Sequence, residues 1–106
     1  MYVTYERNRD EILATLHGEI DHHTAKQMRD ELDKTIINEK PDTFSLVLSD
    51  ISFMDSSGLG LVMGRYKTVT DNGGRMKIIN PSANVTRILN MAGINKMIKI
   101  ERNETK

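Results

Sequence analysis

Between residues 44 and 69, a pattern typical of a buried strand changes into a pattern typical of a helix. Residues 44–48, Phe-Ser-Leu-Val-Leu, form a short apolar run that predicts an interior strand. Further along, apolar side chains recur at helical spacing, at Leu59, Val62, Met63, Tyr66 and Val69. Ser56 and Ser57 therefore fall at the predicted start of a helix. A serine hydroxyl can cap the free backbone N–H groups there, and negative charge, including that of a phosphoryl group, is favoured.

The alternation of strand and helix patterns extends over the rest of the chain. Residues 2–7 and 11–17, joined by a polar turn, predict a hairpin whose second strand ends at Gly18. We expect the next helix to begin with a capping box of Thr24 and Gln27 and to stop at Lys40-Pro41. Its predicted buried stripe consists of Ala25, Met28, Leu32 and Ile36.

Three more elements are expected after the helix that opens at Ser56. They are a strand over residues 76–79, a helix capped by Ser82 and closed by Gly93, and a last strand over residues 96–100. Alternating elements with short connections predict one α/β domain over residues 1–106, with an open, mostly parallel sheet.

Composition excludes several classes of function. Fifteen basic and fifteen acidic side chains balance, and no basic stripe is visible, so we expect neither nucleic acid nor membrane as a partner. Without cysteine there is no disulfide, no thiol nucleophile and no cysteine-ligated zinc. The N-terminal residues lack the apolar core of a signal peptide, so we expect a cytoplasmic protein.

The second predicted helix has an unusual side opposite its apolar stripe. This side is small and uncharged, and it consists of Ser57, Gly60, Leu61, Gly64 and Thr68. A glycine inside a helix costs about 1 kcal/mol relative to alanine, so two of them on one face call for a reason. Either another protein approaches this face closely, or another element of the same domain packs against it.

A polar segment, Asp21-His22-His23, is predicted in the loop before the first helix. This loop emerges at the same carboxyl edge of a parallel sheet as Ser56, which is where such sheets bind ligands. A metal site needs three or four ligands, and the only other histidine is His17 in a strand, so we expect none. Helix capping or contact with a partner is the better interpretation.

Catalytic motifs are not evident. A nucleophile elbow needs glycine two residues before the serine, where this chain has Met54, and there is no glycine-rich phosphate loop. One alternative stays open, namely a small serine- or metal-dependent hydrolase or phosphoesterase that uses Ser56, His22 and His23.

Three blocks of residues point to a family. Residues 18–25 (GEIDHHTA), 53–60 (FMDSSGLG) and 64–67 (GRYK) closely resemble the anti-sigma-factor antagonists, the STAS domains. Within that family the resemblance is nearest to the antagonists of the sporulation sigma factor, sigma-F. It implies an α/β fold with helices wound in sequence along the sheet, and a regulatory protein with neither enzymatic activity nor cofactor.

The resemblance also implies a switch. An unphosphorylated antagonist binds an anti-sigma factor, itself a serine kinase, and so frees the sigma factor. The kinase then phosphorylates the serine after the aspartate, here Ser56, which ends binding until a serine phosphatase removes the phosphate. The expected docking residues are Asp21, His22, His23, Thr24, Asp55, Ser57, Gly58, Gly60, Leu61 and Gly64.

Charge supports that implication. Asp21 and Asp55 match acidic positions beside the phosphoacceptor, and no Lys or Arg lies between Asp50 and Gly64. A phosphate on Ser56 would therefore join an acidic patch. Because only six residues follow the last predicted strand, we expect the extra C-terminal helix of many relatives to be absent.

Overall fold

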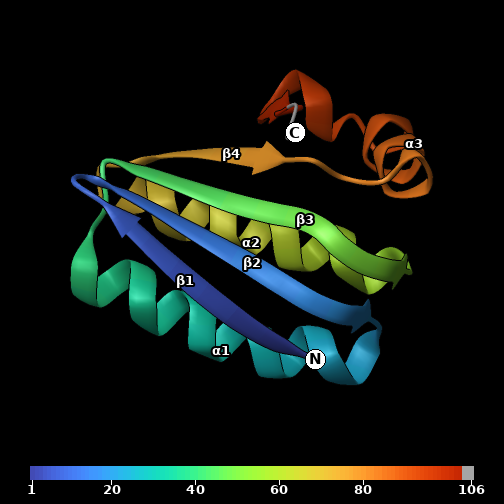
Figure 1. Ribbon diagram of the computed structural model, residues 1–106, viewed down its shortest axis with the longest axis horizontal. Helices are drawn as coiled ribbons and strands as arrows, with labels where there is room; N and C mark the ends of the chain where they lie inside the picture. Colours follow the sequence, from blue (N-terminus) through green and yellow to red (C-terminus); the bar gives the residue numbers. More distant parts are fainter. Residues whose placement is uncertain (104–106) are drawn as a thin grey trace.

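A five-stranded sheet forms the centre of the molecule. The computed structural model describes residues 1–103. Its strands are β1 (Tyr2–Asn8), β2 (Glu11–Ile20), β3 (Thr43–Met54), β4 (Arg75–Ile79) and β5 (Lys99–Glu101). They lie in the order β1-β2-β3-β4-β5, with β1 antiparallel to β2 and every other pair parallel. The predicted hairpin followed by a parallel sheet is thus confirmed (Figure 1).

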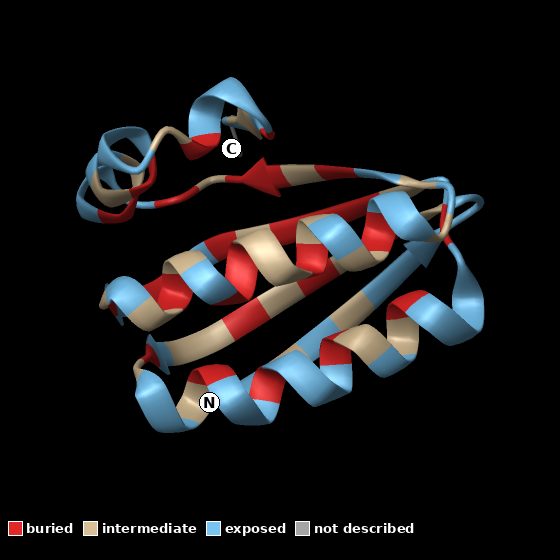
Figure 2. Ribbon diagram, turned by 180° about the vertical axis from the view of Figure 1, so that it is seen from behind, coloured by how far each residue is buried: buried red, intermediate tan, exposed pale blue. Residues whose placement is uncertain are grey.

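Two long helices cover one face of this sheet. They are α1 (His22–Glu39) and α2 (Ser56–Asp71), which lie side by side against the strands. The shorter α3 (Ala83–Met91) and the 3₁₀ helix η1 (Ile94–Lys96) connect β4 to β5, so the helices follow the strands in sequence. Figure 2 shows that the sides of α1 and α2 turned toward the sheet are buried and their outer sides are exposed.

The core lies between the sheet and these helices. Ile12, Ala14 and Leu16 of β2 are buried and alternate with less buried residues, as expected for one face of a strand. From α1 the core receives Ala25, Met28, Leu32 and Ile36, the stripe that the sequence predicts. A fully buried leucine or isoleucine, such as Leu32 or Ile36, contributes about 1.5–3 kcal/mol of transfer free energy, so this layer fixes the position of both helices.

Several predicted boundaries are wrong, and pairing explains most of them. β2 continues through Gly18, whose φ of 124° accompanies an irregularity in register, and ends at Ile20. β3 continues well beyond its apolar run to Met54, because its second half still pairs with β2. Both strands therefore end together, which the local composition does not reveal.

The last strand is also shorter than predicted. Gly93 adopts a left-handed conformation, with φ of 78°, and starts a turn of 3₁₀ helix that extends to Lys96, the first residue of the predicted strand. β5 begins only at Lys99. The expectation that no C-terminal helix follows β5 concerns residues that partly lie outside the described part of the chain.

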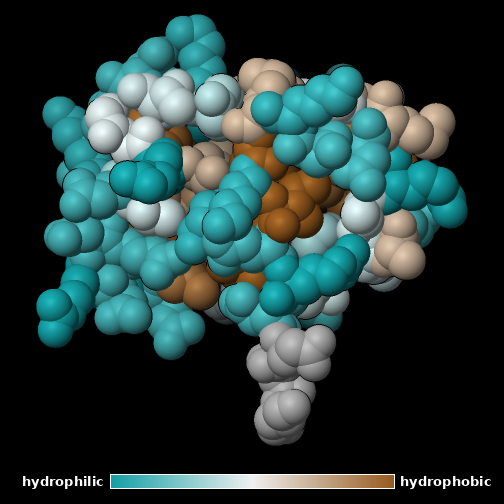
Figure 3. Space-filling view, turned by 90° about the horizontal axis from the view of Figure 1, so that it is seen from above, coloured by the Kyte–Doolittle hydropathy of each residue, from teal (hydrophilic) through white to brown (hydrophobic). Residues whose placement is uncertain are grey.

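Seen from above, on the side of β4 and β5, the surface is mostly hydrophilic around a smaller apolar area (Figure 3). Within residues 1–103, no helix combines the length and the apolar character needed to cross a membrane.

Candidate functional site

The carboxyl ends of β2 and β3 bring the two conspicuous sequence segments together. Ile20 and Met54 are paired across the two strands. Directly after them, the backbone N–H of Asp55 donates a hydrogen bond of 3.1 Å to the carbonyl of Ile20. The prediction that Asp21 and Ser56 follow neighbouring strands at one edge of the sheet is therefore confirmed.

Asp21, rather than Thr24, caps α1. Its carboxylate accepts hydrogen bonds from the backbone N–H groups of His23 and Thr24, each 3.0 Å long. The hydroxyl of Thr24 accepts one of 2.8 Å from the N–H of Asp21 and completes a capping box. The predicted box of Thr24 and Gln27 is wrong by three residues, because the aspartate offers a charged acceptor one turn earlier. His22 and His23 consequently belong to the first turn of α1, and not to a loop.

These hydrogen bonds keep Asp21 ionised. The backbone N–H of Thr24 is the main cause of a lowered pKa for the Asp21 carboxyl, and the Thr24 hydroxyl and the His23 N–H act in the same direction. The edge of the sheet thus has a fixed negative charge beside the start of α1.

Asp55, and not a serine, caps α2. Its carboxylate accepts a hydrogen bond of 2.8 Å from the N–H of Ser57. Ser56 is the first residue of the helix and is exposed, whereas Ser57 is half-buried. The expectation that a serine hydroxyl caps this helix is therefore wrong. The helix start does not depend on Ser56, whose side chain is left at the surface.

The inner side of α2 differs from the predicted stripe. Its buried residues are Gly58, Leu61, Val62, Arg65 and Val69. Val62 and Val69 agree with the prediction, and Leu59, Met63 and Tyr66 are partly buried against the core. Leu61, expected on the outer side, is only 3% exposed. The reason is that α2 packs on α1 as well as on the sheet, so that it buries two sides.

An ion pair joins the two helices, and no sequence pattern indicated it. Arg65, 4% exposed, donates from Nε to an Asp33 carboxylate oxygen at 2.7 Å and from Nη2 to the other oxygen at 3.3 Å. Its Nη1 donates to the carbonyl of Leu61 at 3.2 Å. Burial lowers the pKa of Arg65, and Asp33 opposes that effect. The pair therefore stabilises the contact between α1 and α2 within the helix layer.

The glycines of α2 divide into two kinds. A Cβ atom on Gly58 would overlap the side chain of Met54, so this residue allows close packing inside the domain. A Cβ on Gly60 or Gly64 would meet nothing within 4 Å. Packing of another element of this domain on these two glycines, one of the two explanations left open by the sequence, is therefore wrong for the described residues.

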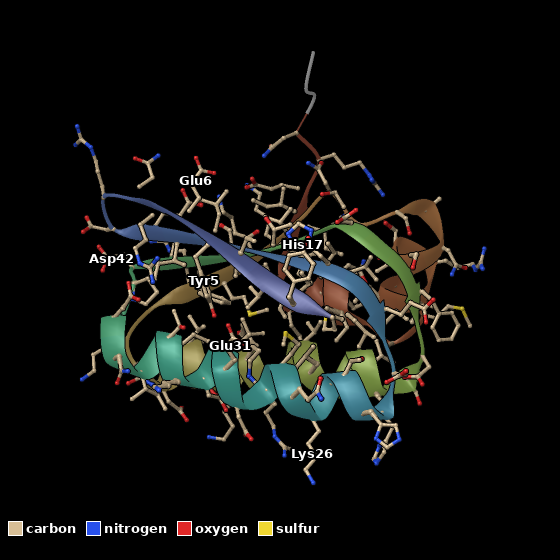
Figure 4. The ribbon with its side chains drawn as sticks, turned by 60° about the horizontal axis from the view of Figure 1, so that its bottom comes forward. Tyr5, Glu6, His17, Lys26, Glu31 and Asp42 are labelled. Carbon is tan, nitrogen blue, oxygen red and sulfur yellow. The ribbon has the colours of Figure 1, made fainter. Side chains whose placement is uncertain are left out.

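A groove of about 470 Å³ runs between the two helices near their N-terminal ends. Its lining residues are His22, Ala25, Lys26 and Arg29 from α1 and Ser57, Gly60, Leu61 and Arg65 from α2. Lys26 and Arg29 were not among the residues selected from the sequence. Figure 4 shows Lys26 on α1 pointing away from the sheet, on the opposite side from His17. Ser57, which follows the exposed Ser56 in the sequence, is part of the groove wall.

The two histidines of α1 contact each other. Their rings meet edge to face, with centroids 5.8 Å apart. Within residues 1–103, no group of three His, Cys, Asp or Glu side chains is arranged so that it could hold a metal ion.

Comparison with known proteins identifies relatives that agree with this architecture. The family model of the STAS domain matches residues 2–106. The sequence is 36% identical over 104 residues to the anti-sigma F factor antagonist of Paenibacillus polymyxa, covering 98% of this chain and 89% of the relative. It is 33% identical over 98 residues to the anti-sigma-B factor antagonist of Bacillus subtilis, covering 92% of this chain and 88% of the relative.

Solved structures agree as well. The unphosphorylated form of the anti-sigma factor antagonist SpoIIAA superposes with a TM-score of 0.82 at 30% identity, over 97% of this chain and 89% of that one. SpoIIAA of Bacillus in its phosphorylated form gives a TM-score of 0.75 at 29% identity, over 97% of this chain and 92% of that one. The expected α/β class, with a mostly parallel sheet and sequential helices, is therefore confirmed.

Proposed function

This chain belongs to the STAS domain family, and from that membership we propose that it is an anti-sigma-factor antagonist switched by phosphorylation of Ser56. In its unphosphorylated form it binds an anti-sigma serine kinase and so releases a sigma factor. The observation that carries the proposal is the position of Ser56, exposed on the first turn of α2 directly after the capping residue Asp55. A kinase can reach this hydroxyl without disturbing the helix start.

Electrostatics explain how one phosphate ends binding. Phosphoserine adds about 1.5–2 negative charges near pH 7. On Ser56 this charge lies beside Asp55, and the ionised Asp21 follows the neighbouring strand. The free N–H groups at the start of α2 tolerate the phosphate, so the fold persists. A partner pressed against the same edge meets concentrated negative charge, and 1.4 kcal/mol of repulsion already weakens binding about tenfold.

The proposed docking surface surrounds Ser56. It consists of Asp21, His22, His23, Thr24, Asp55, Ser57, Gly60, Leu61 and Gly64. Gly60 and Gly64 provide its smooth part, because a Cβ on either would meet no atom of residues 1–103 within 4 Å. Gly58, which the sequence suggested as a further docking residue, is buried against Met54 and is left out. Leu61 contributes through the groove that it lines and not through an exposed side chain.

The resemblance to the sigma-F antagonists favours sigma-F as the sigma factor that is released. The identity to the sigma-F antagonist, 36%, is higher than the 33% identity to the sigma-B antagonist. We place this regulator in the cytoplasm, where the kinase and the phosphatase that acts on phospho-Ser56 would meet it. A role as a hydrolase is the weaker alternative, since the named relatives are antagonists.

One experiment tests the proposal directly. The protein is incubated with the anti-sigma kinase of the same organism and ATP, and the modified residue is mapped by mass spectrometry. We expect one phosphate, on Ser56, no labelling of Ser56→Ala, and normal labelling of the control Ser52→Ala, which removes an exposed serine outside the docking surface. Phosphate on Ser57, or tight binding of the fully phosphorylated protein to the kinase, would contradict the proposal. Release of nitrophenol from nitrophenyl esters or phosphates would favour the hydrolase.

A further inference from the structure

The groove between α1 and α2 concentrates positive charge in a chain whose total charge is balanced. The whole sequence has fifteen basic and fifteen acidic side chains. Three of the eight residues that line the groove are Lys26, Arg29 and Arg65, and none of the eight is Asp or Glu. Because the walls of a groove exclude water in part, a cluster of like charges there produces a stronger field than on a flat surface.

Among the described residues, only one of these three cations has a counter-charge that is partly shielded from solvent. Arg65 is paired with Asp33. Arg29 lies 3.7 Å from Asp30, but the two side chains are 51% and 82% exposed, so solvent screens their attraction. Lys26 takes part in none of the ion pairs formed within residues 1–103. Two cations therefore remain available to a ligand.

The shape of the groove suits an acidic side chain. Gly60 forms part of the α2 wall, and a Cβ there would meet nothing within 4 Å, so the wall is open. Ser57 offers a hydroxyl on the same wall, and His22 offers a ring nitrogen opposite. Both helices begin at this end, where the carboxylates of Asp21 and Asp55 already accept hydrogen bonds from the first N–H groups, so the positive charge of the groove comes from its basic side chains. A carboxylate entering here meets a possible hydrogen-bond donor on each wall and the two available cations of α1.

We propose that this groove binds an acidic segment of the anti-sigma factor, with one or more of its Asp or Glu side chains between Lys26 and Arg29. The inference rests on the proposed function and adds a recognition element to it. It also provides a second reason why phosphorylation of Ser56 would weaken binding. Ser56 is adjacent in sequence to the groove residue Ser57, so a phosphate on Ser56 places negative charge at the entrance and repels the incoming carboxylates.

Charge reversal on α1 tests this inference. The dissociation constant for the anti-sigma factor of the same organism is measured by titration calorimetry for wild type and Lys26→Glu/Arg29→Glu, at low and high salt. We expect the double variant to bind at least about tenfold more weakly at low salt and to lose most of the salt dependence of wild type. The matched control Lys34→Glu, which reverses an exposed charge on α1 outside the groove, should stay within about twofold of wild type.

Charge exchange on the partner then identifies the occupant. Asp→Lys and Glu→Lys variants of the anti-sigma factor are screened against Lys26→Glu/Arg29→Glu, and at least one should restore binding. If none restores it, the occupant is not an acidic segment and the inference is wrong.

The failure of this inference differs from the failure of the proposed function. Should the double variant bind as wild type does while Ser56→Glu binds poorly, the groove is not a docking element but the switch at Ser56 stands. Should wild type not bind the anti-sigma factor at all, the proposed function is wrong and the inference falls with it. The neutral variant Lys26→Gln/Arg29→Gln tests the same inference in case charge reversal impairs folding. We expect its affinity to lie between those of wild type and the reversed variant.

Discussion

At the scale of single residues, Asp21 makes stability depend on pH. Hydrogen bonds from Thr24 and His23 lower its pKa below the ordinary 3.8. A group with a lowered folded-state pKa stabilises the fold above its unfolded-state pKa, and that contribution is lost as pH falls through the folded-state value. Asp21→Asn keeps an acceptor for the N–H groups but has no carboxyl to titrate. We therefore expect the thermal midpoint of Asp21→Asn to fall less than that of wild type between pH 7 and about pH 3.

The matched control is Asp30→Asn on the exposed side of α1. Its thermal midpoint should follow the wild-type dependence on pH. An Asp21→Asn variant that followed wild type equally closely would show that the cap contributes no acid sensitivity.

A second residue-scale prediction separates Ser56 from its neighbour. Because Asp55 caps α2, Asp55→Ala should lower the free energy of unfolding by about 0.5–2 kcal/mol. Ser56→Ala removes an exposed hydroxyl and should change it by less than about 0.5 kcal/mol. Urea titration followed by circular dichroism measures both. A larger loss for Ser56→Ala than for Asp55→Ala would mean that the serine has a structural role.

Both helix starts show where sequence reasoning falls short at this scale. The sequence located each start within a few residues, and it brought Asp21 and Ser56 to the same edge. It selected Thr24 and a serine as caps, although the preceding aspartates cap both helices. Ser, Thr and Asp are nearly equivalent N-caps, so the choice among close neighbours depends on where the strand ends, which only long-range pairing decides.

At the scale of elements, the ion pair of Arg65 and Asp33 holds α1 against α2. Removing one partner leaves the other without its counter-charge. Because Arg65 is 4% exposed, Asp33→Ala should lower the free energy of unfolding by about 1–3 kcal/mol. Arg65→Met in the Asp33→Leu background should recover much of that loss, since an apolar pair of similar size needs no counter-charge. Urea unfolding of the single and double variants gives the coupling free energy between Arg65 and Asp33. If the effects of the single variants simply added up in the double variant, the predicted coupling would be absent.

Two glycines of α2 that are two residues apart lead to opposite predictions. Gly60→Ala should raise the free energy of unfolding by up to about 1 kcal/mol, because the site is helical and open. Gly58→Ala should lower it, because the new Cβ collides with the side chain of Met54. Thermal unfolding compares the two.

Gly60→Glu should keep its stability and yet weaken binding to the anti-sigma factor, and a collapse of its stability would place Gly60 in internal packing.

Hydrophobic periodicity explains why α1 was predicted better than α2. α1 buries a single apolar stripe, and a window of the sequence reveals such a stripe completely. α2 buries two sides, and Arg65 occupies one of the buried positions. Hydrophobic periodicity predicts that an arginine is exposed. Arg65 is buried because an aspartate on another helix, Asp33, supplies its counter-charge, and a pattern within one helix cannot indicate that partner. The groove was missed for the same reason, because Lys26 and Arg29 become notable only when α2 lies beside them.

At the scale of the whole molecule, the order of elements was predictable and their exact ends were not. Right-handed connections between successive parallel strands, in the order β2-β3-β4-β5, place α1 and α2 on the same face. That arrangement follows from the alternation of elements alone. The same arrangement brings the segments that follow β2 and β3 to the carboxyl edge of the sheet. The location of the candidate site was therefore predictable, although its hydrogen bonds were not.

The last prediction is that phosphorylation changes the surface of this molecule and not its fold. Phosphate on Ser56 adds charge outside the core, at a helix start whose N–H groups favour it. The thermal midpoint of the phosphorylated protein should therefore stay within a few degrees of wild type, and its far-UV spectrum should be unchanged. Its affinity for the anti-sigma factor should fall at least about tenfold, because the repulsion acts across a closely packed interface.

Salt separates repulsion from a conformational change. At about 0.1 M salt, charges farther apart than about 10 Å are largely screened, so raising the salt concentration should recover part of the lost affinity if repulsion is the cause. Ser56→Asp, which adds a single charge, should bind with an affinity between those of wild type and the phosphorylated protein. If the phosphorylated protein unfolded at a much lower temperature than wild type, the phosphate would be destabilising the fold. The loss of binding would then follow from a weakened start of α2 and not from charge repulsion at the interface.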